Sequence, residues 1–90
     1  MSKTFQTVSQ LSTVMSSCGV ILRGHFSVNG EEYRAEADEN LSWLNVIDDN
    51  SHCMNCQIDE DKDVIFDSGE YLADNWTDED WQELTNFVRN

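Results

Sequence analysis

In residues 20–37 the chain reads VILRGHFSVNGEEYRAEA, and this stretch predicts a β-hairpin. Its centre, Asn29-Gly30, is the dipeptide that best tolerates the two positive φ values of a type I′ turn. A two-residue loop fixes the register, so Phe26 is expected opposite Tyr33 on a mostly apolar face. The other expected pairs are Val28 with Glu31, Gly24 with Ala35, Leu22 with Ala37, His25 with Arg34 and Arg23 with Glu36.

A second hairpin is predicted from residues 53–59 and 63–67, where Cys56 and Ile58 alternate on one arm and Val64 and Phe66 on the other. The turn between the arms holds the densest acidic cluster of the chain, Asp59-Glu60-Asp61-Lys62-Asp63. Residues 40–47 fit neither period well, and they are interpreted as a short helix or an irregular segment.

Helices are predicted at both ends of the chain. Apolar residues recur at helical spacing in residues 4–17, and Gly19 follows as a C-cap. At the other end, Thr77 is the expected N-cap of a helix from about Asp78 to Arg89, and Trp76 is expected to pack on Trp81 as a hydrophobic staple. A shorter turn is expected in residues 70–75. The apolar residues of the first helix are Phe5, Val8, Leu11, Val14 and Met15.

The composition is that of a folded protein, with 39% hydrophobic and 26% charged residues among 90. A chain of this length makes a single domain, residues 1–90, with a small core. The predicted fold is α+β: an antiparallel sheet of about four strands in two hairpins, with an N-terminal and a C-terminal helix. The order of the strands is left open, because two hairpins and two helices permit several arrangements.

The charge is distributed very unevenly along the chain. Residues 1–30 contain no acid and two bases, whereas residues 31–90 contain eighteen acids and three bases, which gives formal charges of +2 and −15. Such a field repels nucleic acid and anionic membranes and attracts basic protein surfaces. No apolar run approaches the ~20 residues of a membrane span. Three cysteines make no disulfide framework, which favours a reducing cytoplasm.

The acidic half is the candidate partner-binding surface. In an extended segment, Asp59, Asp61 and Asp63 would form a row of charges about 6.6–7 Å apart, broadly comparable with a nucleic-acid backbone. The competing interpretation is a solvated acidic surface without a partner. Exposed ion pairs contribute little each, so an aromatic anchor is also expected, with Tyr71, Trp43 and Trp76 as candidates. The predicted binding residues are Asp48, Asp49, Asp59, Glu60, Asp61, Asp63, Asp67, Glu70, Tyr71 and Asp74.

Two metal sites are weighed against this interpretation. Asp59, Asp61, Asp63, Asp67 and Glu70 occupy positions 1, 3, 5, 9 and 12 of an EF-hand-like loop. Position 6 is nevertheless Val64, and a β-branched residue is strongly disfavoured at the positive φ that this position needs.

The second metal candidate is zinc, held by His52, Cys53 and Cys56 with Cys18 or His25 as a fourth ligand. A lone CxxC is a weak signal, and in a strand its two thiols would face opposite sides. No metal or other cofactor is therefore assigned.

Enzymatic activity is not predicted. Carboxylate pairs have little discriminating value where one residue in five is acidic, and the sequence has neither a glycine-rich phosphate loop nor a nucleophile elbow. His25 is expected on the outer hairpin face, in a cross-strand contact with Arg34 or Glu32.

In size, charge and layout the chain resembles the small acidic phage-encoded inhibitors that mimic nucleic acids, including anti-CRISPR and anti-restriction proteins. Those inhibitors share acidity and compactness and no signature motif, so the resemblance transfers no individual residue. It implies a non-enzymatic inhibitor, made in the cytoplasm of an infected bacterial host, that occupies the basic groove of a CRISPR effector complex or nuclease. The alternatives are an acidic module that binds a basic transcription or replication protein, and a small metal-binding domain.

Overall fold

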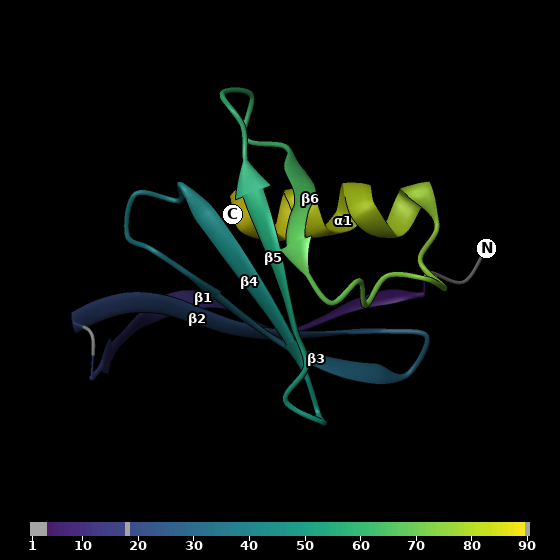
Figure 1. The fold of residues 1–90 in the computed structure, drawn as a ribbon, viewed down its shortest axis with the longest axis horizontal. Helices are drawn as coiled ribbons and strands as arrows, with labels where there is room; N and C mark the ends of the chain where they lie inside the picture. The colour runs from purple at the N-terminus through teal and green to yellow at the C-terminus, as the bar shows by residue number, and fades with distance from the viewer. Residues whose placement is uncertain (1–3, 18, 90) are drawn as a thin grey trace.

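The computed structural model describes residues 4–17 and 19–89, and Figure 1 shows its fold. Within these residues, six strands form one antiparallel sheet in the order of the chain, and a single helix follows them. The elements are β1 (Phe5–Ser16), β2 (Gly19–Val28), β3 (Glu31–Ala37), β4 (Trp43–Asp48), β5 (Cys53–Ile58), β6 (Val64–Gly69) and α1 (Asp78–Arg89).

The hairpin predicted in residues 20–37 is confirmed as β2 and β3. Asn29 and Gly30 have φ values of 55° and 82°, as a type I′ turn requires. All the expected pairs form, among them Phe26 with Tyr33 and Arg23 with Glu36. The sequence therefore determines both the turn and the face that each side chain occupies.

The second hairpin and the C-terminal helix are also confirmed. β5 and β6 carry the acidic cluster at their turn. Thr77 caps α1: its Oγ1 accepts the Asp80 N–H at 3.2 Å, and its own N–H donates to Asp80 Oδ2 at 2.9 Å. The rings of Trp76 and Trp81 lie 5.0 Å apart, as the staple predicts.

The helix predicted in residues 4–17 is wrong, because this segment is strand β1. The pairing with β2 shifts register between Thr7 and Ser9 and again between Ser9 and Ser12. Each such bulge adds a residue to a strand, so alternate positions no longer keep a period of two. Phe5 and Leu11 contact the core, whereas Val8 and Met15, which the helix would have placed with them on one face, are exposed. Serine, threonine and valine, which fill most of the segment, are also modest helix formers.

Residues 40–47 are likewise not a helix or an irregular segment, because most of them belong to β4. Leu44 and Val46 face the core and are fully buried, while Trp43 and Ile47 lie on the opposite face. The expected four-stranded sheet between two helices is thus wrong. The structure is a six-stranded antiparallel meander with one C-terminal helix.

The core lies between α1 and one face of the sheet, and Figure 1 shows the helix on that side. At Gly24 the helix lies very close to the sheet. A Cβ atom there would come within 2.8 Å of both Phe87 Cζ and the Ser9 carbonyl oxygen. The small side chain of Ala35 lies next to it on β3. Because these side chains are small, the ring of Phe87 packs directly on the sheet at this point. The side chains on the opposite face of the sheet are largely exposed.

We predict that Asp80→Asn destabilises the protein by about 1–2 kcal/mol near neutral pH. Burial alone would raise the pKa of Asp80, but hydrogen bonds from the Thr4 hydroxyl and from Thr77 lower it below its usual value. A carboxylate with a lowered folded-state pKa stabilises fully above about pH 4, and that contribution is lost as the pH falls through the folded-state value.

Urea unfolding followed by circular dichroism between about pH 7 and pH 2 tests this expectation. The wild type should lose more stability on acidification than Asp80→Asn does. The matched control, Glu79→Gln, changes an exposed acid of the same helical turn and should shift stability by less than about 1 kcal/mol. Equal pH dependence of the wild type and Asp80→Asn would contradict the assigned role.

Candidate functional site

The acids gather mainly at the two ends of the sheet. One end, here called the tip end, carries the β3–β4 and β5–β6 turns. The other, here called the linker end, carries the β2–β3 and β4–β5 turns and the linker of residues 70–77 that leads to α1. In Figure 1 the β5–β6 turn is at the top and the β4–β5 turn at the bottom.

Three turns are built on the same aspartate geometry. Asp38, Asp48 and Asp59 each begin a turn, and the carbonyl oxygen of each accepts the N–H of the residue three positions later at 2.9–3.1 Å. Each carboxylate Oδ1 also accepts the N–H of the fourth residue on, at 2.6–2.9 Å. The residue three positions after the aspartate has a positive φ of 54–67° in all three turns. Sequence reasoning missed this repeat, whose signal is Asp-acid-Asn/Asp at residues 38–40, 48–50 and 59–61.

These aspartates are therefore parts of the scaffold. Partial desolvation would raise the pKa of Asp48, but the N–H groups of His52 and Asn50 lower it below its usual value. The pKa of Asp38 is lowered for the same reason, against its own desolvation, by hydrogen bonds from Ser42 and Trp43. Carboxylates that accept backbone N–H groups hold the chain in the turn.

The second acid of each turn has no such role. Glu39, Asp49 and Glu60 are exposed, and none of them has a hydrogen-bond or ion-pair partner among the residues that the structure describes. The turn geometry requires only the first aspartate. The second acid adds to the charge of the protein without holding the fold.

The structure divides the predicted binding residues between the two ends. One set lies at the tip end and another at the linker end, separated by the six residues of β5, or about 20 Å. Asp67 lies on β6 between them, where its Oδ1 accepts a hydrogen bond from Gln57 at 3.2 Å. The tip end holds Asp59, Glu60, Asp61 and Asp63, and the linker end holds Asp48, Asp49, Glu70, Tyr71 and Asp74.

At the tip end, carboxylate oxygens of Asp59, Asp61 and Asp63 lie within 4.8 Å of one another. An EF-hand loop is not formed, because β6 runs from Val64 to Gly69, which places Asp67 on the strand and Glu70 beyond it at the linker end. Val64 is buried, and its N–H donates to Thr85 Oγ1 of α1 at 3.2 Å.

A cation at the tip end would also compete with a guanidinium that is already there. Arg89 Nη2 donates to the Asp61 carbonyl oxygen at 2.6 Å and lies 3.3 Å from Asp63 Oδ1. Asp59 Oδ1 already accepts two backbone N–H groups. The geometry therefore favours an ion-paired turn over a calcium loop.

At the linker end, acids surround aromatic side chains. A cleft of about 380 Å³ is lined by Glu31, Asp48 and Asp74 together with Tyr33 and Tyr71. Sequence reasoning did not select Glu31 for the site, although Glu31 follows the predicted Asn29-Gly30 turn directly and begins β3 at the linker end.

Two aromatic residues that line the cleft, Tyr33 and Trp76, pack in or against the core. Burial raises the pKa of the Tyr33 phenol. The Trp76 ring meets the Tyr33 ring edge to face at 5.5 Å, and its buried indole N–H has no hydrogen-bond partner among the described residues. Among the three proposed anchors, Trp76 is thus a core residue and Trp43 lies on the open sheet face, whereas Tyr71 is 46% exposed beside the acids.

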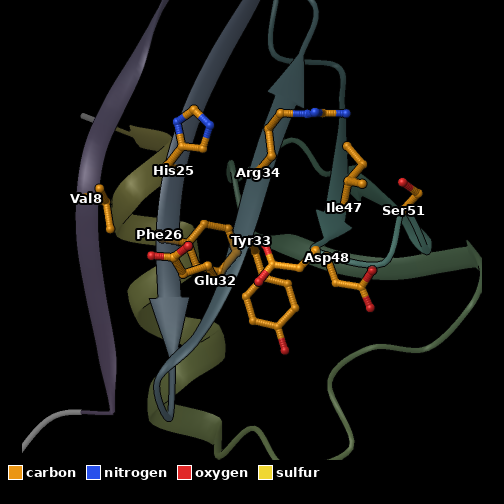
Figure 2. A pocket seen from close by; sticks show the side chains of 10 residues that line it. Val8, His25, Phe26, Glu32, Tyr33, Arg34, Ile47, Asp48 and Ser51 are labelled. Carbon is orange, nitrogen blue, oxygen red and sulfur yellow. The ribbon is translucent and has the colours of Figure 1, made fainter.

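The open sheet face has a different character, as Figure 2 shows. Residues of β1 to β4 and of the β4–β5 turn line a hollow of about 330 Å³ that mixes Arg34 and His25 with Glu32 and Asp49. His25 Nδ1 lies 3.1 Å from Ser9 Oγ, and among the described residues no carboxylate bonds its other nitrogen to complete a triad. Opposite charges partly offset one another here, so this face is not part of the acidic surface apart from Asp49, which belongs to the β4–β5 turn at the linker end.

The zinc candidates do not converge. Cys53 lies opposite Ile47 on the open face, whereas Cys56 lies opposite Leu44 in the core. Burial raises the pKa of the Cys56 thiol to about 12 and also raises that of Cys53, so both favour the neutral form that binds metals poorly. The His52 ring is 3.2 Å from Asp48 Oδ2. Cys18 lies outside the described residues.

We predict that the first and second acids of the turns differ in their effect on stability. Replacing the second acids together, by Glu39→Gln, Asp49→Asn and Glu60→Gln, should leave the Tm unchanged or raise it at low ionic strength, because repulsion falls and no contact is lost. Asp59→Ala, the control, should lower the Tm by several degrees, because two turn N–H groups lose their acceptor. A large loss of Tm in the triple variant would refute the distinction.

A second expectation concerns the thiols. In a Cys18→Ser variant, Cys56 should resist a thiol-specific reagent at about pH 8 until the protein unfolds, whereas Cys53, which is partly exposed, should react slowly in the folded state. Absorbance of the released chromophore measures both rates. Protein purified without chelator should contain no stoichiometric zinc, and rapid modification of both thiols in the folded protein would contradict the assigned faces.

No helix among the described residues is both long enough and apolar enough to cross a bilayer. Comparisons of the chain with protein-family models, with curated proteins and with solved structures find no match.

Proposed function

We propose that the protein is a non-enzymatic inhibitor that binds the basic nucleic-acid-binding surface of another protein through the linker end of its sheet. The observation that carries this proposal is the group of exposed acids around Tyr71 for which the fold has no use. Asp49 and Asp74 have no hydrogen-bond or ion-pair partner among the described residues. Within the described part of the chain, the basic group within 4 Å of Glu70 is the His52 ring, 3.8 Å away.

Excess charge of this size is unfavourable for the fold itself. A small domain needs a net charge of about 2–8 for solubility, and this chain has −13. None of the three arginines, all of them within the described residues, is paired with an acid of the linker end. Arg23 and Arg34 pair with Glu36 on the open face, and Arg89 pairs with Asp63 at the tip end. The negative field at the linker end, which the described arginines do not offset by ion pairing, therefore suits a partner rich in lysine and arginine.

Charge alone does not give tight binding. Exposed ion pairs contribute about 0–1 kcal/mol each and weaken with salt. The linker end adds the exposed ring of Tyr71, an aromatic residue of the kind that dominates binding energy in protein interfaces. In such an interface, the acids speed the encounter with the basic partner, and the ring of Tyr71 supplies binding energy once the partner is in place.

The partner we propose is a CRISPR effector complex or a nuclease of a bacterial defence system, whose groove for nucleic acid is basic. This assignment rests on the resemblance in size, charge and layout to phage-encoded mimics. It places the protein in the cytoplasm of an infected bacterial host and requires neither a cofactor nor direct contact with nucleic acid or membrane.

The test is binding of the full chain to a panel of purified CRISPR effector complexes and nucleases, measured by biolayer interferometry. For a true target, Kd should rise by about tenfold or more between about 50 and 300 mM NaCl, and duplex DNA should compete. Replacing the acids of the linker end by Glu31→Gln, Asp49→Asn, Glu70→Gln and Asp74→Asn should weaken binding by at least about tenfold.

The matched control alters the tip end, where Glu60→Gln and Asp61→Asn should change Kd by less than about threefold. Asp48 and Asp59 are left unchanged because they hold turns. Binding that is indifferent to salt, or a linker-end variant that binds as the wild type does, would refute the proposal.

A further inference from the structure

A groove lies between the edge strand β6 and the first turn of α1, beside the linker end. It has a volume of about 360 Å³. Five of its six lining residues are apolar or aromatic, and the sixth is an acid. The lining residues are Val64, Ile65, Phe66, Tyr71, Asp78 and Trp81.

The aromatic walls of the groove are held in place. The rings of Phe66 and Tyr71 meet edge to face, with centroids 5.1 Å apart and planes at 89°. Trp81 is held from behind by Trp76, at 5.0 Å. Phe66 is nevertheless 40% exposed and Tyr71 46% exposed, so their rings remain open to a ligand.

The charge of the groove favours a cation. Asp78 is its only charged lining residue, and Glu79 follows in the same helical turn. A helix N-terminus has a partial charge of about +0.5, which opposes a cation, but the carboxylates of Asp78 and Glu79 outweigh it. Glu70, whose side chain is 63% exposed, precedes Tyr71 in the linker and adds to the negative field.

We propose that this groove takes the side chain of an arginine from the basic partner. The inference rests on the proposed function and names its anchor. A guanidinium is planar and weakly hydrated, so it stacks on Phe66, Tyr71 or Trp81, while its N–H groups reach the Asp78 carboxylate. Lysine offers a compact, strongly hydrated charge that stacks less well.

The other occupants fit less well. A purely apolar side chain would cover Asp78 and leave its carboxylate without a partner, which is costly. A second copy of this chain would bring a further formal charge of −13 to an acidic groove. At neutral pH arginine combines a flat surface for the rings with a full charge for the acid, whereas histidine, which is equally flat, has an ordinary pKa of about 6.5 and is largely uncharged.

The test is a titration of the ¹⁵N-labelled full chain with the blocked peptide acetyl-Gly-Arg-Gly-amide, followed by heteronuclear NMR. Amide signals of Phe66, Tyr71 and Asp78 and the indole signal of Trp81 should shift together and saturate. The lysine peptide should bind at least about threefold more weakly. The citrulline peptide, which has nearly the same shape without the charge, should cause no saturable shift.

Two conservative variants probe the two halves of the groove. Asp78→Asn removes the charge and Phe66→Leu removes one aromatic face without emptying the site, and each should weaken the arginine peptide by at least about threefold. Asp61→Asn at the tip end, the control, should have no effect. Shifts spread over acids at both ends of the sheet, or equal binding of the citrulline peptide, would overturn the assignment.

The two proposals fail separately. An effector complex that binds the wild type and Phe66→Leu equally well, with no saturable peptide binding, would remove the arginine site and leave the inhibitor function standing. Saturable arginine binding without any target among basic proteins would do the reverse.

Discussion

The structure depends on the ring of Phe26. It is fully buried, and it contacts Phe5 of β1, Tyr33 of β3, Trp76 of the linker and Phe87 of α1, with ring centroids 4.9–5.9 Å apart. One side chain thus joins four separate segments of a chain that is too short for a second core. The contact also places the linker, since Trp76 lies between Phe26 and Trp81 and fixes where residues 70–77 cross the end of the sheet. The position of Tyr71 and of its neighbouring acids follows from this cluster.

The acidic half of the chain combines two kinds of carboxylate that composition alone does not separate. Asp38, Asp48, Asp59 and Asp80 accept backbone N–H groups and close turns or begin the helix. They belong to the fold as surely as the buried residues do. Other acids, such as Asp49 and Asp74, make no contact that the fold uses. A net charge of −13 therefore overstates the charge that is available for binding, because the aspartates of the turns already accept backbone N–H groups. The function proposed above uses the acids of the linker end that have no such contact.

Local chemistry made about half of the fold predictable. Asn29-Gly30 fixes its turn and register because few other dipeptides accept two positive φ values, and Thr77 with the two tryptophans marks the start of α1. β1 was not predicted because its apolar residues do not mark one buried face: Phe5 and Leu11 reach the core, whereas Val8 and Met15 are exposed. For the candidate site, the acids were evident from the sequence, but their division between two ends was not. It depends on β4 being a strand, which sets the direction of every later element, and the groove between β6 and α1 brings together residues that no local pattern connects.

The repeated turn has a consequence for how such a protein changes over time. The first aspartate of each turn is constrained by its hydrogen bonds, and the third residue after it by its positive φ. The second position is exposed and has no hydrogen-bond or ion-pair partner among the described residues. Glu39, Asp49 and Glu60 are thus three sites at which charge can be gained, lost or reversed in a single step without a penalty in folding. If the protein binds a partner as proposed, its surface charge can change one turn at a time while Phe26 and the turn aspartates keep the same architecture.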